Sequence, residues 1–373
     1  MPYAPLDAVR HRIAVGQPLP FNVLNRDGTL LLARGKVLDT EDRLAALMDR
    51  GMLVDVVELF RGAQAIKMAP RELLPSLWAD NLKQVNLALQ QADQPGFRAA
   101  LTEAGEPVMA LVERDPDLAI FQVMRQDDNP HVQYGLNHSV HAAIVCRLVA
   151  HRLGWSVDEA TRAFKAALTM NLGMLELQGR LASQHTPPSE SQRRQIESHP
   201  TRSRELLEAA GVDDPLWLQA VEQHHERADG RGYPSGLRAP CELATLLQEA
   251  DRYATKLSSR ATREALPADR AGREVFMADP SSPIVAALVK EFGVYPPGCF
   301  VQLASGETGI VVARGPTVMA PVVALLADAQ GTPLGAPRRC DTTDRARAVA
   351  QVLPPRAMRP HIDLRQLGKL ALA

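Results

Sequence analysis

The stretch that most restricts how this chain can fold is residues 224–237, which read HHERADGRGYPSGL. It opens with two adjacent histidines, and glycine or proline then occupies four of the seven positions 230–236. Glycine allows a left-handed backbone and proline fixes φ, so the stretch suits neither a helix interior nor a strand. We therefore predict a compact loop that follows a helix ending near His224 and His225. A histidine pair beside a rigid loop indicates a site, although this stretch alone does not define its chemistry.

The composition predicts a largely helical, cytoplasmic protein of two or three domains. The 42 basic residues nearly balance the 43 acidic ones and leave a net charge of −1, which gives no reason to expect binding to a nucleic acid polymer or to anionic lipid. The first residues lack the apolar core of a signal peptide, and no apolar run is long enough to span a bilayer. The four cysteines show no paired spacing and are expected to be reduced thiols. They are Cys146, Cys241, Cys299 and Cys340.

Changes of pattern along the chain predict four parts. Asp27-Gly28 lies between two short apolar runs, as in a hairpin turn, and Thr40 is expected to cap a helix that ends at Gly51. Apolar residues at helical spacing predict a helical segment next, structural or dimerising, and short β-branched runs after about residue 294 predict a β hairpin. The parts are a small α/β module over 1–70, a helical lead-in over 71–127, a helical domain with its C-terminal β hairpin over 128–335, and a tail over 336–373.

Helix boundaries in the central domain are marked by capping residues. Ser156 with Glu159, and Ser189 with Gln192, have the spacing of a capping box. Asp214 and Pro215 suit the N-cap and first position of the helix that leads to the histidine pair. Pro200 is expected to interrupt a helix just after His199.

Five residues on separate predicted helices form a candidate metal site. They are His138, His199, His224, His225 and Asp251. Imidazole nitrogens with one carboxylate suit Fe, Mn, Zn or Ni, and bundle helices can supply such inward-facing ligands. Each histidine alone is more often an ordinary surface or hydrogen-bonded core residue. Sequence spacing does not establish that the five converge.

The loop resembles the signature of the HD-GYP family, HHE-x-x-DG-x-GYP-x-GL, at every specified position. The resemblance extends to HSV at 138–140, SHP at 198–200 and EADRYATKLSSR at 249–260, which correspond to segments that carry the family's metal ligands. It implies a mainly α, HD-type helical bundle with a small N-terminal α/β module and a C-terminal β hairpin. Members of the family hydrolyse cyclic di-GMP at a centre of two or three metal ions, so the resemblance implies bacterial cyclic di-GMP signalling and Fe or Mn as the metal.

The residues that give the family its name are absent. The segment corresponding to LLHDIGK is ALTMNLGM, in which Met170 replaces the histidine, Asn171 the aspartate and Met174 the lysine. Tyr134 occupies the position of the glutamate that three-metal members use. A neutral amide bridges two cations poorly and a thioether matches Mn or Fe poorly, whereas two-metal hydrolysis needs closely spaced ions. We therefore expect a catalytically inactive protein.

Three functions follow from these residues. The first is a degenerate HD-GYP protein that acts as a regulatory, nucleotide-binding or protein-interaction module, with cyclic di-GMP as ligand and GGDEF-domain diguanylate cyclases as partners. The second is a weak metal-dependent cyclic di-GMP phosphodiesterase that uses a residual metal site, since three or four ligands suffice for one ion. The third is a purely structural role. A homodimer through residues 71–127 is a further expectation.

Further residues are assigned to the ligand and the partner from the same resemblance. Arg260 and Arg263 are expected to pair with phosphate, or else to end a surface helix. Tyr233 is expected to contact the nucleotide, or else to pack within the loop. The predicted partner-binding loop comprises Asp229, Gly230, Gly232, Tyr233, Pro234 and Gly236.

Overall fold

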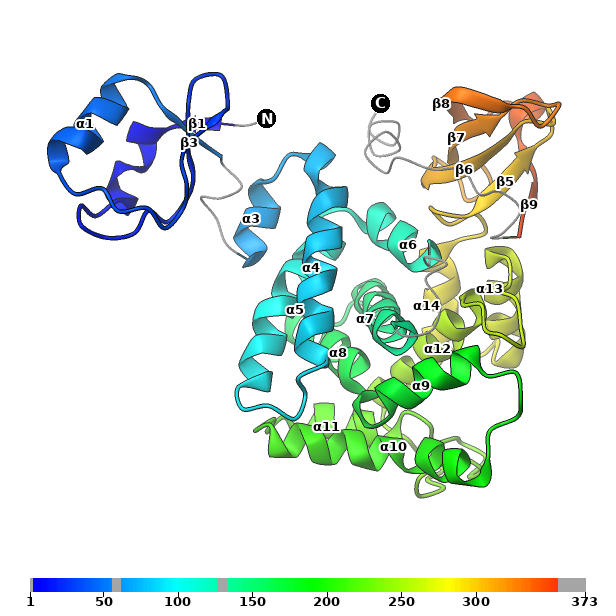
Figure 1. The fold of residues 1–373 in the computed structure, drawn as a ribbon. Coiled ribbons are helices and arrows are strands. Elements are labelled where there is room, and N and C mark those ends of the chain that lie inside the picture. Colours follow the sequence, from blue (N-terminus) through cyan, green and yellow to red (C-terminus); the bar gives the residue numbers. More distant parts are fainter. Residues whose placement is uncertain (1–2, 56–61, 126–132, 355–373) are drawn as a thin grey trace.

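The computed structural model describes residues 3–55, 62–125 and 133–354. These residues form a helical core, with one small antiparallel sheet in the N-terminal part of the chain and another in the C-terminal part (Figure 1). The predicted fold class, mainly α with a small α/β module before the bundle and a β appendage after it, is confirmed.

The N-terminal module has a hydrophobic core of its own. Its elements are β1 (Tyr3–Pro5), η1 (Leu6–Arg12), β2 (Val23–Leu24), β3 (Leu30–Leu32), α1 (Glu41–Asp49) and β4 (Leu53–Asp55). The strands pair antiparallel in the order β1-β4-β2-β3 and bury Phe21, Val23 and Val54 against Leu44 of α1. The predicted turn is present, because Asp27-Gly28 joins the antiparallel strands β2 and β3. Thr40 caps α1 by accepting a hydrogen bond from the Arg43 amide, as predicted.

The helical core runs from α3 to α14. Its elements are α3 (Gly62–Met68), η2 (Arg71–Leu73), α4 (Leu74–Leu89), α5 (Phe97–Arg114), α6 (Pro116–Met124), α7 (Tyr134–Arg152), α8 (Val157–Thr169), η3 (Leu172–Met174), α9 (Leu175–Ser183), α10 (Glu190–Ala209), α11 (Pro215–Gln223), α12 (Glu242–Leu257), α13 (Ala268–Ala278) and α14 (Pro283–Phe292). One continuous apolar cluster joins them, and α7 lies at its centre with almost every side chain buried. Burial of α7 on all sides matches its lack of a polar face.

The predicted caps are present. Ser156 and Glu159 form a reciprocal capping box on α8, and Ser189 and Gln192 form one on α10. Asp214 caps α11 by accepting hydrogen bonds from two amides of its first turn. These local signals place the helix starts without help from tertiary contacts.

The prediction that Pro200 interrupts its helix is wrong, because α10 continues through this residue. A proline inside a helix cannot donate to the carbonyl four residues earlier, here that of Ile196. The Nδ1 atom of His199 lies 2.6 Å from that oxygen and donates to it instead. The histidine side chain therefore satisfies the carbonyl that the proline leaves free.

Two of the predicted domain limits differ from the structure, the one at residue 70 and the one between residues 335 and 336. The helix α3 lies before the limit at residue 70, yet Ile66 belongs to the helical core and not to the core of the N-terminal module. The lead-in helices α4, α5 and α6 also pack into that core, with Trp78 fully buried. These apolar faces are covered within the chain, and a homodimer through residues 71–127 stays a prediction. The limit at residue 128 lies outside the described residues.

The C-terminal appendage is larger than the predicted hairpin. It is a five-stranded antiparallel sheet in the order β8-β7-β6-β5-β9. Its elements are β5 (Phe300–Leu303), β6 (Thr308–Ala313), β7 (Val322–Ala327), β8 (Pro333–Asp341), η4 (Arg345–Arg347) and β9 (Val349–Val352). The predicted limit between residues 335 and 336 falls inside β8, and β9 pairs with β5 although its segment was expected to be a tail. Pairing with β5 makes this segment a strand, although its own sequence has little preference for one.

Arg314 joins the sheet to the helices. Its guanidinium forms ion pairs with Asp117 of α6 and with Glu291 of α14, and its backbone N–H also donates to Asp117. Glu291 pairs in turn with Arg152 at the end of α7. All four cysteines are free. None of the described helices combines the length and the apolar character that a membrane span requires.

Replacing Arg314 should loosen the attachment of the sheet. Arg314→Met leaves the mostly buried carboxylate of Glu291 with fewer partners, so we expect a loss of about 1–3 kcal/mol in the free energy of unfolding. We also expect faster amide exchange in β6 and α14. The control is Arg338→Met, at an exposed position of β8. Equal stability of the two variants would contradict this role for Arg314.

Candidate functional site

The predicted metal ligands come from four helices and meet in one buried region. His138 lies on α7, His199 on α10 and Asp251 on α12, while His224 and His225 directly follow α11. The Nε2 atom of His138 donates to Oδ1 of Asp251 over 2.7 Å. Burial lowers the pKa values of His199, His224 and His225, and the negative charge of Asp251 partly opposes this lowering at each of them. Asp251 is therefore close enough to interact electrostatically with all three rings. Their convergence is a property of the fold, and their binding of a metal stays a prediction.

Local backbone structure fixes the tautomers of His199 and His224. The Nδ1 atom of His199 lies 2.6 Å from the Ile196 carbonyl, and Nδ1 of His224 lies 2.6 Å from the Val221 carbonyl. A carbonyl only accepts, so both Nδ1 atoms must carry the proton. Pro200 frees the first carbonyl and the end of α11 frees the second. In the neutral rings, both Nε2 atoms therefore carry a lone pair.

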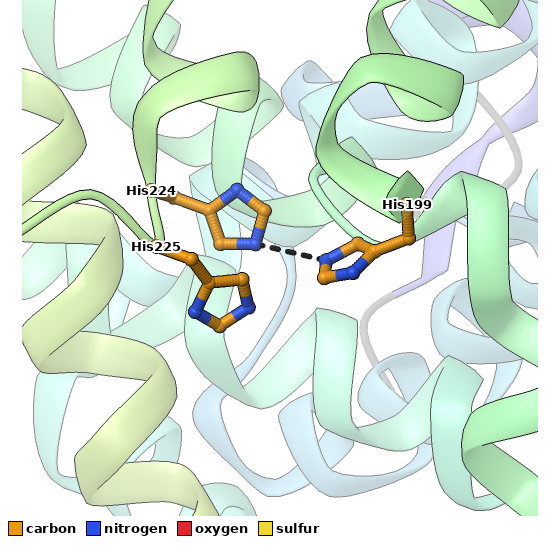
Figure 2. A group of neighbouring side chains, drawn as sticks. All are labelled: His199, His224 and His225. Carbon is orange, nitrogen blue, oxygen red and sulfur yellow. Dashed lines mark hydrogen bonds between the residues drawn. The ribbon is translucent and has the colours of Figure 1, made fainter. Parts of the chain in front are cut away.

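These two lone pairs point at each other. The Nε2 atoms of His199 and His224 are 3.2 Å apart, as the dashed line in Figure 2 marks. A hydrogen bond between them requires one ring to be protonated. Burial opposes this first, and the neighbouring His224 opposes it further, so the pKa of His199 falls to about 3. Burial likewise lowers the pKa of His224.

His225 completes a triad of imidazoles. One ligand nitrogen each from His199, His224 and His225 can be chosen so that all lie within 4.8 Å of one another. The His225 ring lies 4.1 Å from that of His224 between centroids, below it in Figure 2. Tyr233 covers the other side of His225 at a centroid distance of 4.6 Å. Its pKa is raised by burial and then by Asp251, which places the phenol at the same site.

The His199–His224 pair has the spacing of two ligands of a single transition-metal ion. Two nitrogens that bind one ion at about 2.1 Å lie about 3.0 Å apart at right angles and about 3.4 Å apart at a tetrahedral angle. The observed 3.2 Å lies between these values. Metal-binding histidines usually donate their other N–H to a carbonyl or carboxylate, as His199 and His224 do here. Such an ion would satisfy two nitrogens that otherwise repel each other.

The segment that replaces the family's dyad packs beside His199. A Cβ on Gly173 would lie 2.8 Å from the His199 carbonyl oxygen, so only glycine permits this approach. Met170 is fully buried in the apolar core. Asn171 is also fully buried, and neither Oδ1 nor Nδ2 has a hydrogen-bond partner among the described residues. Met174 is partly exposed. The segment thus places no anionic side chain beside the triad, which fits one ion better than two.

The glycine-rich loop is held by Glu226, a residue that sequence reasoning left out of the site. This carboxylate is 2% exposed and accepts hydrogen bonds from the amides of Ser235 at 2.7 Å and Leu237 at 2.8 Å. The Tyr233 amide donates to the carbonyl of His225, and this hydrogen bond holds the loop next to the triad. The signal for Glu226 in the sequence was its place as the glutamate of the HHE signature, directly after the histidine pair.

Two further contacts fix the loop and were not predicted. Gln248 of α12 donates to the carbonyls of His224 and Glu226 at 3.2 and 2.8 Å. A Cβ on Gly232 would lie 2.5 Å from the His225 carbonyl oxygen, which explains the glycine. At the exposed end of the loop, Asp229 pairs with Arg227 and accepts from the Arg231 amide. Nothing in the sequence marked Gln248.

The two predicted phosphate-binding arginines are placed differently. The Nε atom of Arg260 donates to the hydroxyl of Tyr134 at 3.0 Å, and the Tyr134 ring stacks parallel to the His138 ring. Arg260 is thereby connected to the site. Arg263 is exposed and donates to the Thr255 carbonyl. Only Arg260 is tied by side-chain contacts to the histidine cluster.

Comparison with known proteins finds relatives among cyclic-dinucleotide phosphodiesterases. Residues 125–278 match the HD domain family model. A 3'3'-cGAMP-specific phosphodiesterase of Vibrio cholerae is 24% identical over 234 residues, and a cyclic di-GMP phosphodiesterase of Pseudomonas aeruginosa is 26% identical over 228 residues. These matches support membership of the HD-GYP family. The loop of this chain carries the HD-GYP signature, and the role of the histidine triad in this site stays a prediction.

The extent of these similarities is limited. The matches cover 59% and 58% of this chain, and the chain spans about half the length of the two curated relatives, 50% and 53%. Among solved structures, a HDG"Y"P protein of Bdellovibrio bacteriovorus has a TM-score of 0.49 at 17% identity, over 74% of this chain and 94% of that chain.

The buried histidines should make the metal-free HD-GYP protein sensitive to acid. The pKa of His199 is about 3 when folded and about 6.5 as a free side chain, so in this range the unfolded chain binds the proton. Stability is therefore lost as pH falls through about 6.5. One such histidine costs about 2 kcal/mol at about pH 5.

Urea unfolding in chelator at about pH 7.5 and about pH 5 measures this effect. His199→Gln should remove about 2 kcal/mol of the pH-dependent loss. His185→Gln, at an exposed position, is the control and should leave the loss unchanged. A His199→Gln protein with the wild-type pH dependence would show that His199 is not the buried neutral base described above.

The HD-GYP loop should loosen when Glu226 is neutralised. In Glu226→Gln, one oxygen becomes an NH2 group that cannot accept from a loop amide, so we expect a loss of about 1–3 kcal/mol. Hydrogen exchange should quicken at Ser235 and Leu237. Glu264→Gln, at an exposed residue, is the matched control. Unchanged exchange at both amides would refute the scaffold role of Glu226.

Proposed function

We propose that this chain is a degenerate HD-GYP protein that binds cyclic di-GMP at a site with one metal ion and acts as a regulatory or protein-interaction module. One observation carries the proposal. The lone pairs on Nε2 of His199 and His224 face each other at 3.2 Å, without a proton, beside a segment that has Met170 and Asn171 in place of the family dyad. This arrangement supports cation binding without the charge that two close ions need.

The residues of the site divide into binding roles. His199, His224 and His225 would hold the ion, for which Fe or Mn is the expected metal. When bound, such an ion supplies positive charge to a phosphodiester group. Asp251 and His138 satisfy each other and hold α7 against α12. Tyr233, which packs against His225, would lie against the bound nucleotide.

The loop suits a second role as a docking surface. Glu226 and Gln248 hold its backbone from inside, so its outer residues are presented in one conformation. We expect a GGDEF-domain diguanylate cyclase to be the partner. The retention of the loop then needs no hydrolysis to explain it.

A weak metal-dependent phosphodiesterase is the alternative, because three imidazole ligands leave positions open on a single ion. The similarity to enzymes named as cyclic di-GMP and 3'3'-cGAMP phosphodiesterases also favours it. A missing anionic bridge at Asn171 and a missing lysine at Met174 count against efficient turnover.

Metal content and nucleotide binding test the proposal together. Elemental analysis of the purified protein should find one Fe or Mn ion per chain, and calorimetry should detect cyclic di-GMP binding without hydrolysis. His225→Ala should lose the ion. The double variant Met170→His with Asn171→Asp should gain a second ion and turnover, because it restores an anionic bridge.

The outcomes separate the three functions. Turnover of cyclic di-GMP or 3'3'-cGAMP by the wild type, well above that of His225→Ala, would favour the phosphodiesterase. Absence of both metal and nucleotide binding would leave a purely structural role. Binding without turnover supports the regulatory module.

A further inference from the structure

The side chain of Arg260 reaches the histidine cluster through Tyr134. Its Nε atom donates to the Tyr134 hydroxyl at 3.0 Å, and its guanidinium carbon lies 5.4 Å from the centre of the tyrosine ring. The Tyr134 ring also lies parallel to the His138 ring, at 4° and 6.0 Å between centroids. A cation, a phenol and an imidazole thus follow one another at the edge of the site.

Arg260 lacks the carboxylate partner that several other arginines of this chain have. Arg147, Arg152, Arg162 and Arg314 each form an ion pair with a carboxylate. Within residues 3–55, 62–125 and 133–354, Arg260 has no such pair, and its Nη1 and Nη2 atoms form no hydrogen bond. A partly buried guanidinium without a counter-charge is costly, and its planar fork suits two oxygens of a phosphate.

A second arginine strengthens the positive charge. The backbones of Arg260 and Arg263 exchange hydrogen bonds of 2.7 and 3.1 Å across a tight turn. Arg263 is exposed as a whole, but partial shielding of its guanidinium from solvent lowers its pKa, and the charge of Arg260 lowers it further. Two like charges held together by the backbone favour an anion between or beside them.

We propose that Tyr134 is a positioning residue, which holds the Arg260 guanidinium at the His138 side of the cluster as a subsite for a phosphate group rather than for a further cation. The inference rests on the proposed function in that it concerns the same site. The phenol suits this role because its oxygen accepts from Arg260 without adding a negative charge that would compete with the phosphate. The phosphate belongs either to a cyclic dinucleotide or to free orthophosphate.

Calorimetric titrations with inorganic phosphate and with cyclic di-GMP test the inference. Tyr134→Phe keeps the ring against His138 but removes the oxygen, so affinity should fall about five- to tenfold. Tyr134→Glu places a carboxylate beside Arg260, so affinity should fall further, by more than about tenfold. Melting temperature and metal content are measured on every variant, and those of Tyr134→Phe should match the wild type. Tyr295→Phe, on the connection into the β-sheet, is the matched control and should bind normally.

Each result is decisive. The inference is supported if the affinity for either ligand falls from the wild type to Tyr134→Phe and again to Tyr134→Glu, and if Tyr134→Phe retains its metal content. Tyr134-dependent binding of phosphate without binding of cyclic di-GMP keeps the subsite and overturns the proposed nucleotide. Equal affinities of the wild type and Tyr134→Phe, or binding of neither ligand by the wild type, would overturn the inference, as would a second metal ion in the wild type.

Discussion

Two hydrogen bonds from histidine rings to backbone carbonyls determine what this site can do. They keep the ring proton of His199 and of His224 on Nδ1. The two Nε2 atoms then carry lone pairs and lie 3.2 Å apart. Burial keeps both rings neutral, so the repulsion between the lone pairs is not relieved by a proton. Pro200 and the end of α11, which free the two carbonyls, are therefore as important to the site as the rings themselves.

The remaining charges around the triad are few and mostly compensated. Asp251 accepts from His138, and Glu226, although fully buried, is occupied by the amides of the loop. Asn171 adds no charge, and its amide has no partner within the described part of the chain. Arg260 differs because, among the described residues, its guanidinium donates a hydrogen bond only to a phenol. This balance is the basis of the proposal that one cation binds at the histidines and one anion beside them, in place of a two-metal hydrolytic centre.

The HD-GYP loop is also part of the scaffold, so its presence does not by itself indicate catalysis. Gly232 permits the loop to return against His225, and Gln248 ties it to α12. Loss of any of these contacts would disturb the packing of α11 and α12 even in a protein without activity. The sequence motif of the loop therefore indicates the family. It says little about turnover, which is expected to depend on positions in another segment, such as that of Asn171.

Much of the helical framework could be predicted from the sequence, since capping residues such as Ser156 and Asp214 act through their nearest neighbours. The loop and the candidate ligands could be identified for the same reason, because the motif is contiguous. Tertiary structure alone decided that the five candidate ligands converge, that His199 replaces the amide which Pro200 lacks, and that Arg260 donates to Tyr134. It also decided that β9 joins the C-terminal sheet through β5. These features depend on contacts between residues far apart in the chain, for which local propensity and spacing carry no signal.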